Sequence, residues 1–131
     1  KELIKQMHPS TQLVVIELNE AFYQNLNHQL TAANLHIIHG SAADIGLALK
    51  QLKLPKADYI LSSLPLSNFP VNLRNDILTE IQRNLNEDGK LIQFQYSRGL
   101  RKLYSAFFPK VSIDYTVMNF PPAFIYTCSN S

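Results

Sequence analysis

A carboxylate closes a short, largely β-branched run near the start of the chain. Glu17 directly follows Leu13–Ile16, and an apolar run of this kind is typical of a strand buried on both faces of a parallel sheet. In open α/β sheets, ligands bind beyond the carboxyl ends of the strands, where an acidic side chain commonly accepts hydrogen bonds from ribose hydroxyls. Glu17 is therefore a candidate ribose-binding residue. The alternative is a solvated carboxylate at a strand end, and this run alone does not decide between the two.

Cationic side chains and histidines offer the other candidate chemistry. Arg98, Arg101 and Lys102 cluster after a predicted strand and would suit a lipid phosphate or an anionic surface. The solvated face of a helix is the commoner meaning of such a cluster. His36 and His39 point to opposite faces of a predicted strand, so we expect them to share no metal ion and expect no metal site.

Alternating strands and helices must position these residues. Hydrophobic periodicity predicts helices near 1–7, 22–33, 45–52, 73–85 and 97–107, and strands at 13–18, 35–39, 57–63, 91–96, 111–117 and 123–128. Gly89 is predicted to end the fourth helix in a left-handed conformation, and Ser97 to cap the fifth. The last two strands lie too close in sequence for a crossover helix, so we expect an antiparallel hairpin. The order predicts an α/β sheet with helices on both faces and an antiparallel edge.

Length and composition limit the class of protein. The 131 residues predict one domain, 1–131, with 46% apolar and 17% charged residues, which is ordinary for a soluble globular protein. The formal net charge of +2 is too small to indicate nucleic acid or a membrane by itself. Cys128 is the only cysteine, which excludes an internal disulfide and fits a reducing, cytoplasmic setting. No apolar run approaches the roughly 18 residues of a membrane span.

Motifs spread through the chain carry a resemblance to a known family. They are Val15–Asn19, Ile38–Ala42, Ala57–Leu66 and Gly89–Tyr96. With the order of elements, they resemble the class I S-adenosylmethionine-dependent methyltransferases, and most of all the bacterial phospholipid (phosphatidylethanolamine) N-methyltransferases. Those enzymes are similar in turn to the ribosomal RNA adenine dimethyltransferases. The resemblance implies a Rossmann-like methyltransferase sheet that ends in a hairpin, and S-adenosylmethionine as the cofactor.

The resemblance also implies a set of cofactor-binding residues. Glu17 would accept hydrogen bonds from both ribose hydroxyls, Leu18 would cover a face of the adenine, and Ser62 would line the cofactor site. The family usually has Gly-Asp after the second strand, whereas this chain has Gly-Ser and its nearest carboxylate, Asp44, comes three residues later. Ser41 and the backbone N–H of Ala42 would then meet the adenine edge.

A purely structural interpretation of this second motif is also open. It makes Ser41 a helix N-cap and Asp44 a favourable charge in the first turn, and we prefer it for Asp44.

The loop after the third strand is the most discriminating motif. The resemblance places it between the sulfonium methyl and the acceptor nitrogen. Methyl transfer to an amine mainly requires alignment of the reacting atoms, and we expect hydroxyls and backbone carbonyls of Ser63, Leu64, Pro65 and Tyr96 to provide it. The alternative is a plain tight turn after a strand.

The same loop bears on the substrate. Adenine dimethyltransferases have Asn-Leu-Pro-(Tyr/Phe) here, and this chain has Ser63 and Leu66 at the amide and aromatic positions. Neither residue makes a bidentate base contact or a stack, which argues against nucleic acid and for a lipid amine. We expect Leu66, Arg98 and Arg101 to contact that lipid.

The first strand and the glycine-rich loop of the family do not occur in these residues. That strand normally lies between the strand of Glu17 and the strand of Ala57, so we expect a sheet interrupted at that point, with unpaired edges. Three explanations are open: a longer enzyme, which we favour; a strand supplied by another chain in an oligomer; or a decayed remnant. We do not expect these residues alone to be catalytically active.

Together the motifs predict an S-adenosylmethionine-dependent methyltransferase that transfers methyl to the amine of phosphatidylethanolamine-type lipids. We expect a cytoplasmic enzyme, in the alternative one peripheral to the inner membrane face. The rival functions are a ribosomal RNA adenine N6-methyltransferase-like activity and a non-catalytic remnant of a methyltransferase domain.

Overall fold

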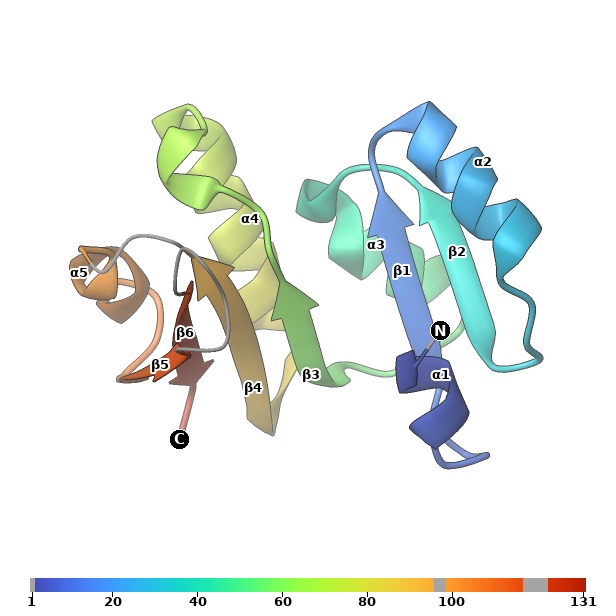
Figure 1. Cartoon of the computed structure of the whole chain (residues 1–131). Helices are drawn as coiled ribbons and strands as arrows, with labels where there is room; N and C mark the ends of the chain where they lie inside the picture. The colour runs from blue at the N-terminus through green and yellow to red at the C-terminus, as the bar shows by residue number, and fades with distance from the viewer. Residues whose placement is uncertain (1, 96–98, 117–122) are drawn as a thin grey trace.

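The computed structural model describes residues 2–95, 99–116 and 123–131. Helices and strands alternate along most of the chain, as Figure 1 shows. In order they are α1 (Glu2–Gln6), β1 (Leu13–Glu17), α2 (Glu20–Gln29), β2 (Leu35–His39), α3 (Ile45–Gln51), β3 (Ala57–Ser62), α4 (Val71–Asn84), β4 (Leu85–Gln95), α5 (Arg101–Ser105), β5 (Lys110–Thr116) and β6 (Ala123–Ser129), with short 3-10 turns η1 (Ala42–Asp44) and η2 (Leu66–Asn68).

The strands form two separate sheets. β1 and β2 pair in parallel, and the other sheet has the order β3-β4-β6-β5. β3 and β4 are parallel, whereas β6 pairs antiparallel with both β4 and β5, which confirms the predicted hairpin. Figure 1 shows β1 and β3 on facing sides of the two sheets, with their arrowheads in the same direction. No described residue pairs with the free edges of β1 and β3, so the interruption predicted between these two strands is confirmed.

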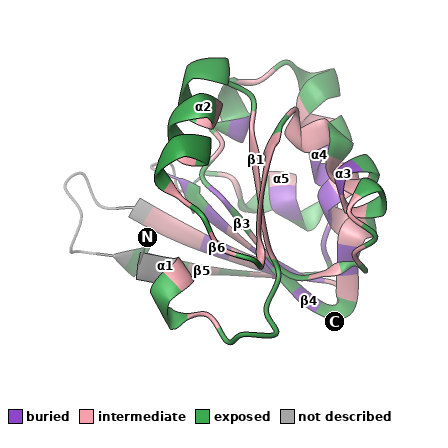
Figure 2. Cartoon of the chain, turned by 90° about the vertical axis from the view of Figure 1, so that its right-hand side faces the viewer, coloured by how far each residue is buried: buried purple, intermediate pink, exposed green. Residues whose placement is uncertain are grey.

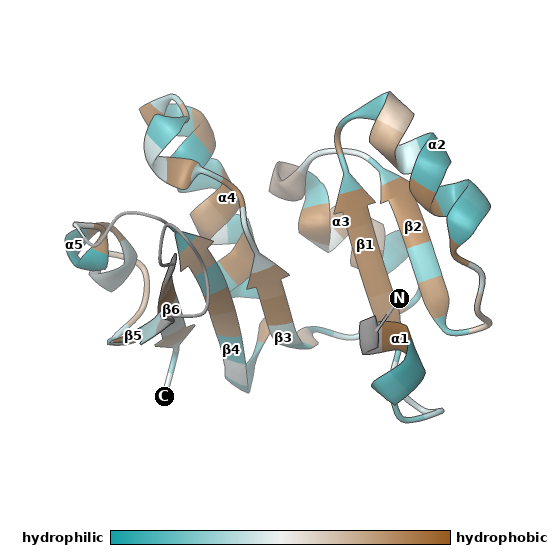
Figure 3. Ribbon diagram, viewed as in Figure 1, coloured by the Kyte–Doolittle hydropathy of each residue, from teal (hydrophilic) through white to brown (hydrophobic). Residues whose placement is uncertain are grey.

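The interruption changes the environment of β1. All five of its residues are half-buried, so the expectation of a strand buried on both faces was wrong for this structure. The physical reason is that β1 has a neighbouring strand along one edge only, which leaves its apolar side chains open on the other side. Figure 3 shows β1 and β3 as predominantly hydrophobic strands, in contrast to the mostly hydrophilic α2.

Helices lie on both faces of the smaller sheet. Figure 2 shows α2 on one side of β1 and both α3 and α4 on the other. α2 is shorter than its apolar pattern predicts: it ends at Gln29, because Leu30 adopts an extended conformation with φ −121° and ψ 126°. Ala33, the last residue of the predicted helix, therefore lies beyond its observed end, and Phe22, at the start of the predicted range, is 60% exposed.

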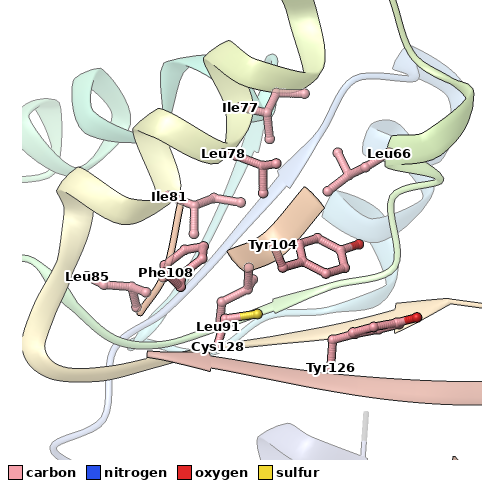
Figure 4. Packing of buried hydrophobic residues seen from close by; sticks show 10 residues of the cluster. All are labelled: Leu66, Ile77, Leu78, Ile81, Leu85, Leu91, Tyr104, Phe108, Tyr126 and Cys128. Carbon is pink, nitrogen blue, oxygen red and sulfur yellow. The ribbon is translucent and has the colours of Figure 1, made fainter. Parts of the chain in front are cut away.

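The buried core belongs to the larger sheet. One face of β4 and β6 packs against α4, α5 and the turn η2, as Figure 4 shows. The members of this cluster are Leu66, Ile77, Leu78, Ile81, Leu85, Leu91, Tyr104, Phe108, Tyr126 and Cys128. Leu66 follows the loop at the end of β3, so its burial in the core anchors that loop.

Gly89 has a different role from the one predicted. α4 ends at Asn84, and Leu85 already has the extended backbone of β4, so Gly89 lies within the strand. None of the described glycines has a positive φ. A Cβ on Gly89 would lie 3.0 Å from the carbonyl oxygens of Ala57 and Asn86, which makes close backbone approach the reason for glycine here. The register between β3 and β4 shifts at this point.

The N-cap predicted at Ser97 lies outside the described residues.

Candidate active site at the carboxyl ends of the strands

The end of β1 is tied to the end of β2. The backbone N–H of Gly40 donates to the carbonyl of Glu17 at 3.0 Å, and His39 Nε2 lies 3.0 Å from the carbonyl oxygen of Leu18. The His39 ring also stacks on Tyr23, with centroids 5.3 Å apart. These contacts fix the turn that carries Glu17 and Leu18.

The carboxylate of Glu17 is half-buried and held by its own turn. Its Oε1 accepts the backbone N–H of Asn19 at 3.0 Å. The side chain of Asn19 in turn caps α2 by accepting the N–H of Phe22. In the described part of the chain no other group bonds to this carboxylate, so its second oxygen carries no hydrogen bond from these residues. Leu18, beside it, is 72% exposed, which leaves an apolar side chain next to an acceptor.

Ser41 acts as an N-cap at the end of β2. Its Oγ accepts the backbone N–H of Ala43 at 3.1 Å, at the start of η1. Asp44 is exposed at the end of that turn. Both residues fit the structural interpretation, while the predicted contacts of Ser41 and Ala42 with adenine stay predictions. Ser41 also lines a hollow between the strand ends and α3, together with Ile16, Ile38, Gly40, Leu47 and Ala48.

A tight turn follows β3. Pro65 has φ −77° and ψ 68°, the conformation at the centre of an inverse γ-turn. The corresponding bond is present, since the N–H of Leu66 donates to the carbonyl of Leu64 at 2.8 Å. Ser62 is buried, and its Oγ accepts the N–H of Leu64 at 3.3 Å. Ser63, directly before the turn, is exposed.

Leu66 anchors this turn in the core. Its side chain is 0% exposed, and Figure 4 shows it pointing towards Leu78 and Tyr104. This burial gives no support to a contact between Leu66 and a substrate, which stays a prediction. Arg101 is exposed at the start of α5, whereas Tyr96 and Arg98 lie outside the described residues.

Two glutamines that the sequence analysis did not single out complete the arrangement. Gln93 Nε2 donates to the Leu64 carbonyl at 2.8 Å, and Gln95 Nε2 donates to the same oxygen at 2.6 Å. Gln93 is 0% exposed and Gln95 is 7% exposed. The available signal was their alternation with Ile92 and Phe94, which puts both amides on the buried face of β4 beside Leu91.

The parallel strands bring these groups to one edge of the molecule. β1, β2 and β3 all point the same way in Figure 1, so Glu17, Ser41 and the turn at Pro65 follow strand ends at that edge. Within residues 2–95, 99–116 and 123–131, no cluster of three or more His, Cys, Asp or Glu side chains is suited to a metal ion. Over the same ranges, no helix has both the length and the apolar character needed to cross a membrane.

Comparison with known proteins supports the methyltransferase fold. No family model matches the chain. The chain is 27% identical over 130 residues to the ornithine lipid N-methyltransferase of Singulisphaera acidiphila, an alignment that spans 98% of this chain and 68% of that protein.

Solved structures agree with this assignment of the fold. Human Methyltransferase-like protein 13 in complex with SAH superposes with a TM-score of 0.72 at 14% identity, over 99% of this chain and 66% of that one. The precorrin-6y C5,15-methyltransferase of Geobacter metallireducens superposes with a TM-score of 0.65 at 17% identity, over 94% of this chain and 69% of that one. The chain therefore has the Rossmann-like α/β fold of the methyltransferases, as predicted, and spans about two thirds of the length of these proteins.

Proposed function

We propose that this protein is an S-adenosylmethionine-dependent N-methyltransferase whose acceptor is the amine of a lipid head group. The observation that carries the proposal is the similarity to an ornithine lipid N-methyltransferase along 98% of the chain. The loop after β3 supports it, because Ser63 and Leu66 stand where a base-methylating enzyme needs an amide and an aromatic ring.

The end of β1 fits the nucleoside of S-adenosylmethionine. An adenosine presents two vicinal hydroxyls and a flat apolar ring. Glu17 offers an open carboxylate oxygen, and Leu18 offers an apolar side chain that is 72% exposed beside it. Glu17 would hold the ribose, Leu18 would cover the ring, and Ser41, Ala42 and Ser62 would complete the site.

The acceptor would approach over the turn at Pro65. When bound, S-adenosylmethionine supplies an electrophilic methyl group that an uncharged amine attacks in line with the carbon–sulfur bond. The chain's contribution is positioning: the exposed Ser63 hydroxyl orients the amine, and Tyr96 is assigned the same role. Arg98 and Arg101 would face the anionic part of the lipid.

Titration calorimetry on the full-length protein tests the cofactor. We expect S-adenosylmethionine to bind, and Glu17→Ala to raise its Kd about tenfold or more, since the variant loses charge-assisted hydrogen bonds to the ribose. Glu20→Ala is the matched control, because it removes an exposed carboxylate three residues further on and should leave Kd unchanged. Absence of binding in the wild-type protein would overturn the proposal.

Methyl incorporation tests the acceptor. The label from S-adenosylmethionine should enter vesicles that contain ornithine lipid or phosphatidylethanolamine, and should not enter phosphatidylcholine vesicles, whose nitrogen is already quaternary. Comparison of the first two vesicles identifies the head group. Incorporation into ribosomal RNA without incorporation into either lipid would refute the lipid acceptor and favour adenine methylation.

A further inference from the structure

The carbonyl oxygen of Leu64 receives an unusual number of donors. The backbone N–H of Leu66 reaches it at 2.8 Å across the γ-turn, Gln93 Nε2 at 2.8 Å and Gln95 Nε2 at 2.6 Å. A carbonyl oxygen has two lone pairs. This oxygen therefore has no capacity left to accept a hydrogen bond from a substrate amine.

The two glutamines share this contact. Both lie on the buried face of β4, in positions where an apolar side chain would avoid the cost of burying an amide. Within the described part of the chain, Gln93 Oε1 has no hydrogen-bond partner. The only bond that the Gln93 amide makes there is the one to Leu64, so the amide nitrogen must face the carbonyl oxygen.

We propose that Gln93 and Gln95 are positioning residues that clamp the Leu64 carbonyl and so present Ser63 to the methyl acceptor. The proposal rests on the proposed function, and it divides the roles within the loop. Leu64 and Leu66 hold the turn, one through its carbonyl and the other through its buried side chain. Ser63, which is exposed directly before Leu64, is left as the residue that meets the amine.

The expected kinetic effect is selective. Loss of the clamp lets the turn shift against the acceptor, and a misplacement near 1 Å costs about 10²-fold in rate. Of the proposed cofactor groups, Glu17, Leu18, Ser41 and Ala42 belong to the ends of β1 and β2 on the other sheet, and Ser62 alone belongs to β3. We therefore expect Gln95→Met in the full-length protein to lower kcat/KM for the lipid amine by about 10²-fold, while the Kd of S-adenosylmethionine changes less than twofold.

Gln82→Met is the matched control. Gln82 Nε2 also donates to a backbone carbonyl, that of Phe107, at 2.8 Å, but this bond joins α4 to the segment that follows α5. The control loses the same kind of bond and should keep kcat/KM. A Gln95→Met variant that folds and keeps kcat/KM within twofold of the wild type would overturn the proposal.

A second measurement does not depend on activity. Carbon-13 at the Leu64 carbonyl and the amide signal of Leu66 report the turn directly by NMR. We expect both to shift in Gln93→Met and Gln95→Met, and neither to shift in Gln82→Met. Unchanged signals in the folded variants would refute the clamp, even if the wild-type protein proved to have no methyltransferase activity.

Gln95→Glu provides a rescue test. An ionised carboxylate cannot donate to the Leu64 carbonyl, whereas a protonated carboxylic acid can. The carbonyl signal should therefore move away from its wild-type position at neutral pH and return towards it as the pH falls through the titration of the new carboxyl. A signal that does not respond to this titration would contradict the clamp.

Discussion

The two tyrosines in the core offer a sharp test of the packing beneath the loop. Their rings lie 4.9 Å apart with an interplanar angle of 54°, but their hydroxyls have different surroundings. Tyr104 is 0% exposed, and its hydroxyl has no hydrogen-bond partner among the described residues. The hydroxyl of Tyr126 accepts the backbone N–H of Leu100 at 3.3 Å. Removal of each hydroxyl should therefore have opposite effects.

The magnitudes follow from the cost of unpaired polar groups. A buried polar group without a partner costs about 1–3 kcal/mol, so Tyr104→Phe should raise the free energy of unfolding by about 1 kcal/mol or more. Tyr126→Phe leaves the Leu100 N–H unpaired and should lower the free energy by about 1 kcal/mol. Both variants keep the aromatic ring, so the change in apolar packing is small.

Urea denaturation followed by circular dichroism measures the difference. The two variants should differ by about 2 kcal/mol or more, with an unchanged m value, because the surface exposed on unfolding is nearly the same. A Tyr104→Phe variant that is less stable than the wild type would show that this hydroxyl has a partner. The packing assigned to α5 would then be wrong.

Three further predictions concern the core, Gly89 and the loop after β3. Burial raises the pKa of Cys128 from 9.0 to about 12, so the unfolded state releases the thiol proton at a lower pH than the folded state. The free energy of unfolding should therefore be unaffected below pH 9 and fall between pH 9 and pH 12. Cys128→Ala should reduce that fall, as measured by urea titrations at each pH. Gly89→Ala should cost about 1–3 kcal/mol because its Cβ would lie 3.0 Å from backbone oxygens, whereas Gly99→Ala, with no atom within 4 Å, should be near neutral in the same assay. Ser63→Ala should lower kcat/KM for the lipid amine about tenfold without changing the binding of S-adenosylmethionine. Ser67 is another exposed serine close by, and Ser67→Ala should change neither quantity. Equal effects of the two substitutions would argue against a role for Ser63.

Local sequence patterns were sufficient to predict most of the fold. The predictions of β1, β2, β3 and α4 used only the pattern of apolar residues within each element. The short connection near the end of the chain was sufficient to predict the hairpin. The wrong predictions concern contacts between elements, which such local patterns do not contain. The apolar positions of α2 extend to Ala33, but the helix ends at Gln29, and Gly89 is explained by a contact with Ala57 some thirty residues away.

The candidate site shows the same division. The acidic residue at the end of a strand and the proline loop could be found from residue types and spacing. The clamp could not, since Gln93 and Gln95 meet Leu64 only when β4 pairs with β3. Buried amides at inward-facing positions of a predicted strand are the signal that would have pointed to them, because a buried polar group requires a partner.

The separation of the two sheets determines what holds the site together. Glu17 belongs to the sheet of β1 and β2, and the clamped loop belongs to the sheet of β3 and β4, with no backbone bonding between them. The main packing between the two parts, among the described residues, is helical: α3 and η1 pack against α4, so closely that a Cβ on Gly46 would lie 3.1 Å from the Asn84 side chain. The position of the Glu17 carboxylate relative to the loop after β3 thus depends on helix packing. A parallel strand between β1 and β3 would fix the same relation through hydrogen bonds along both free edges.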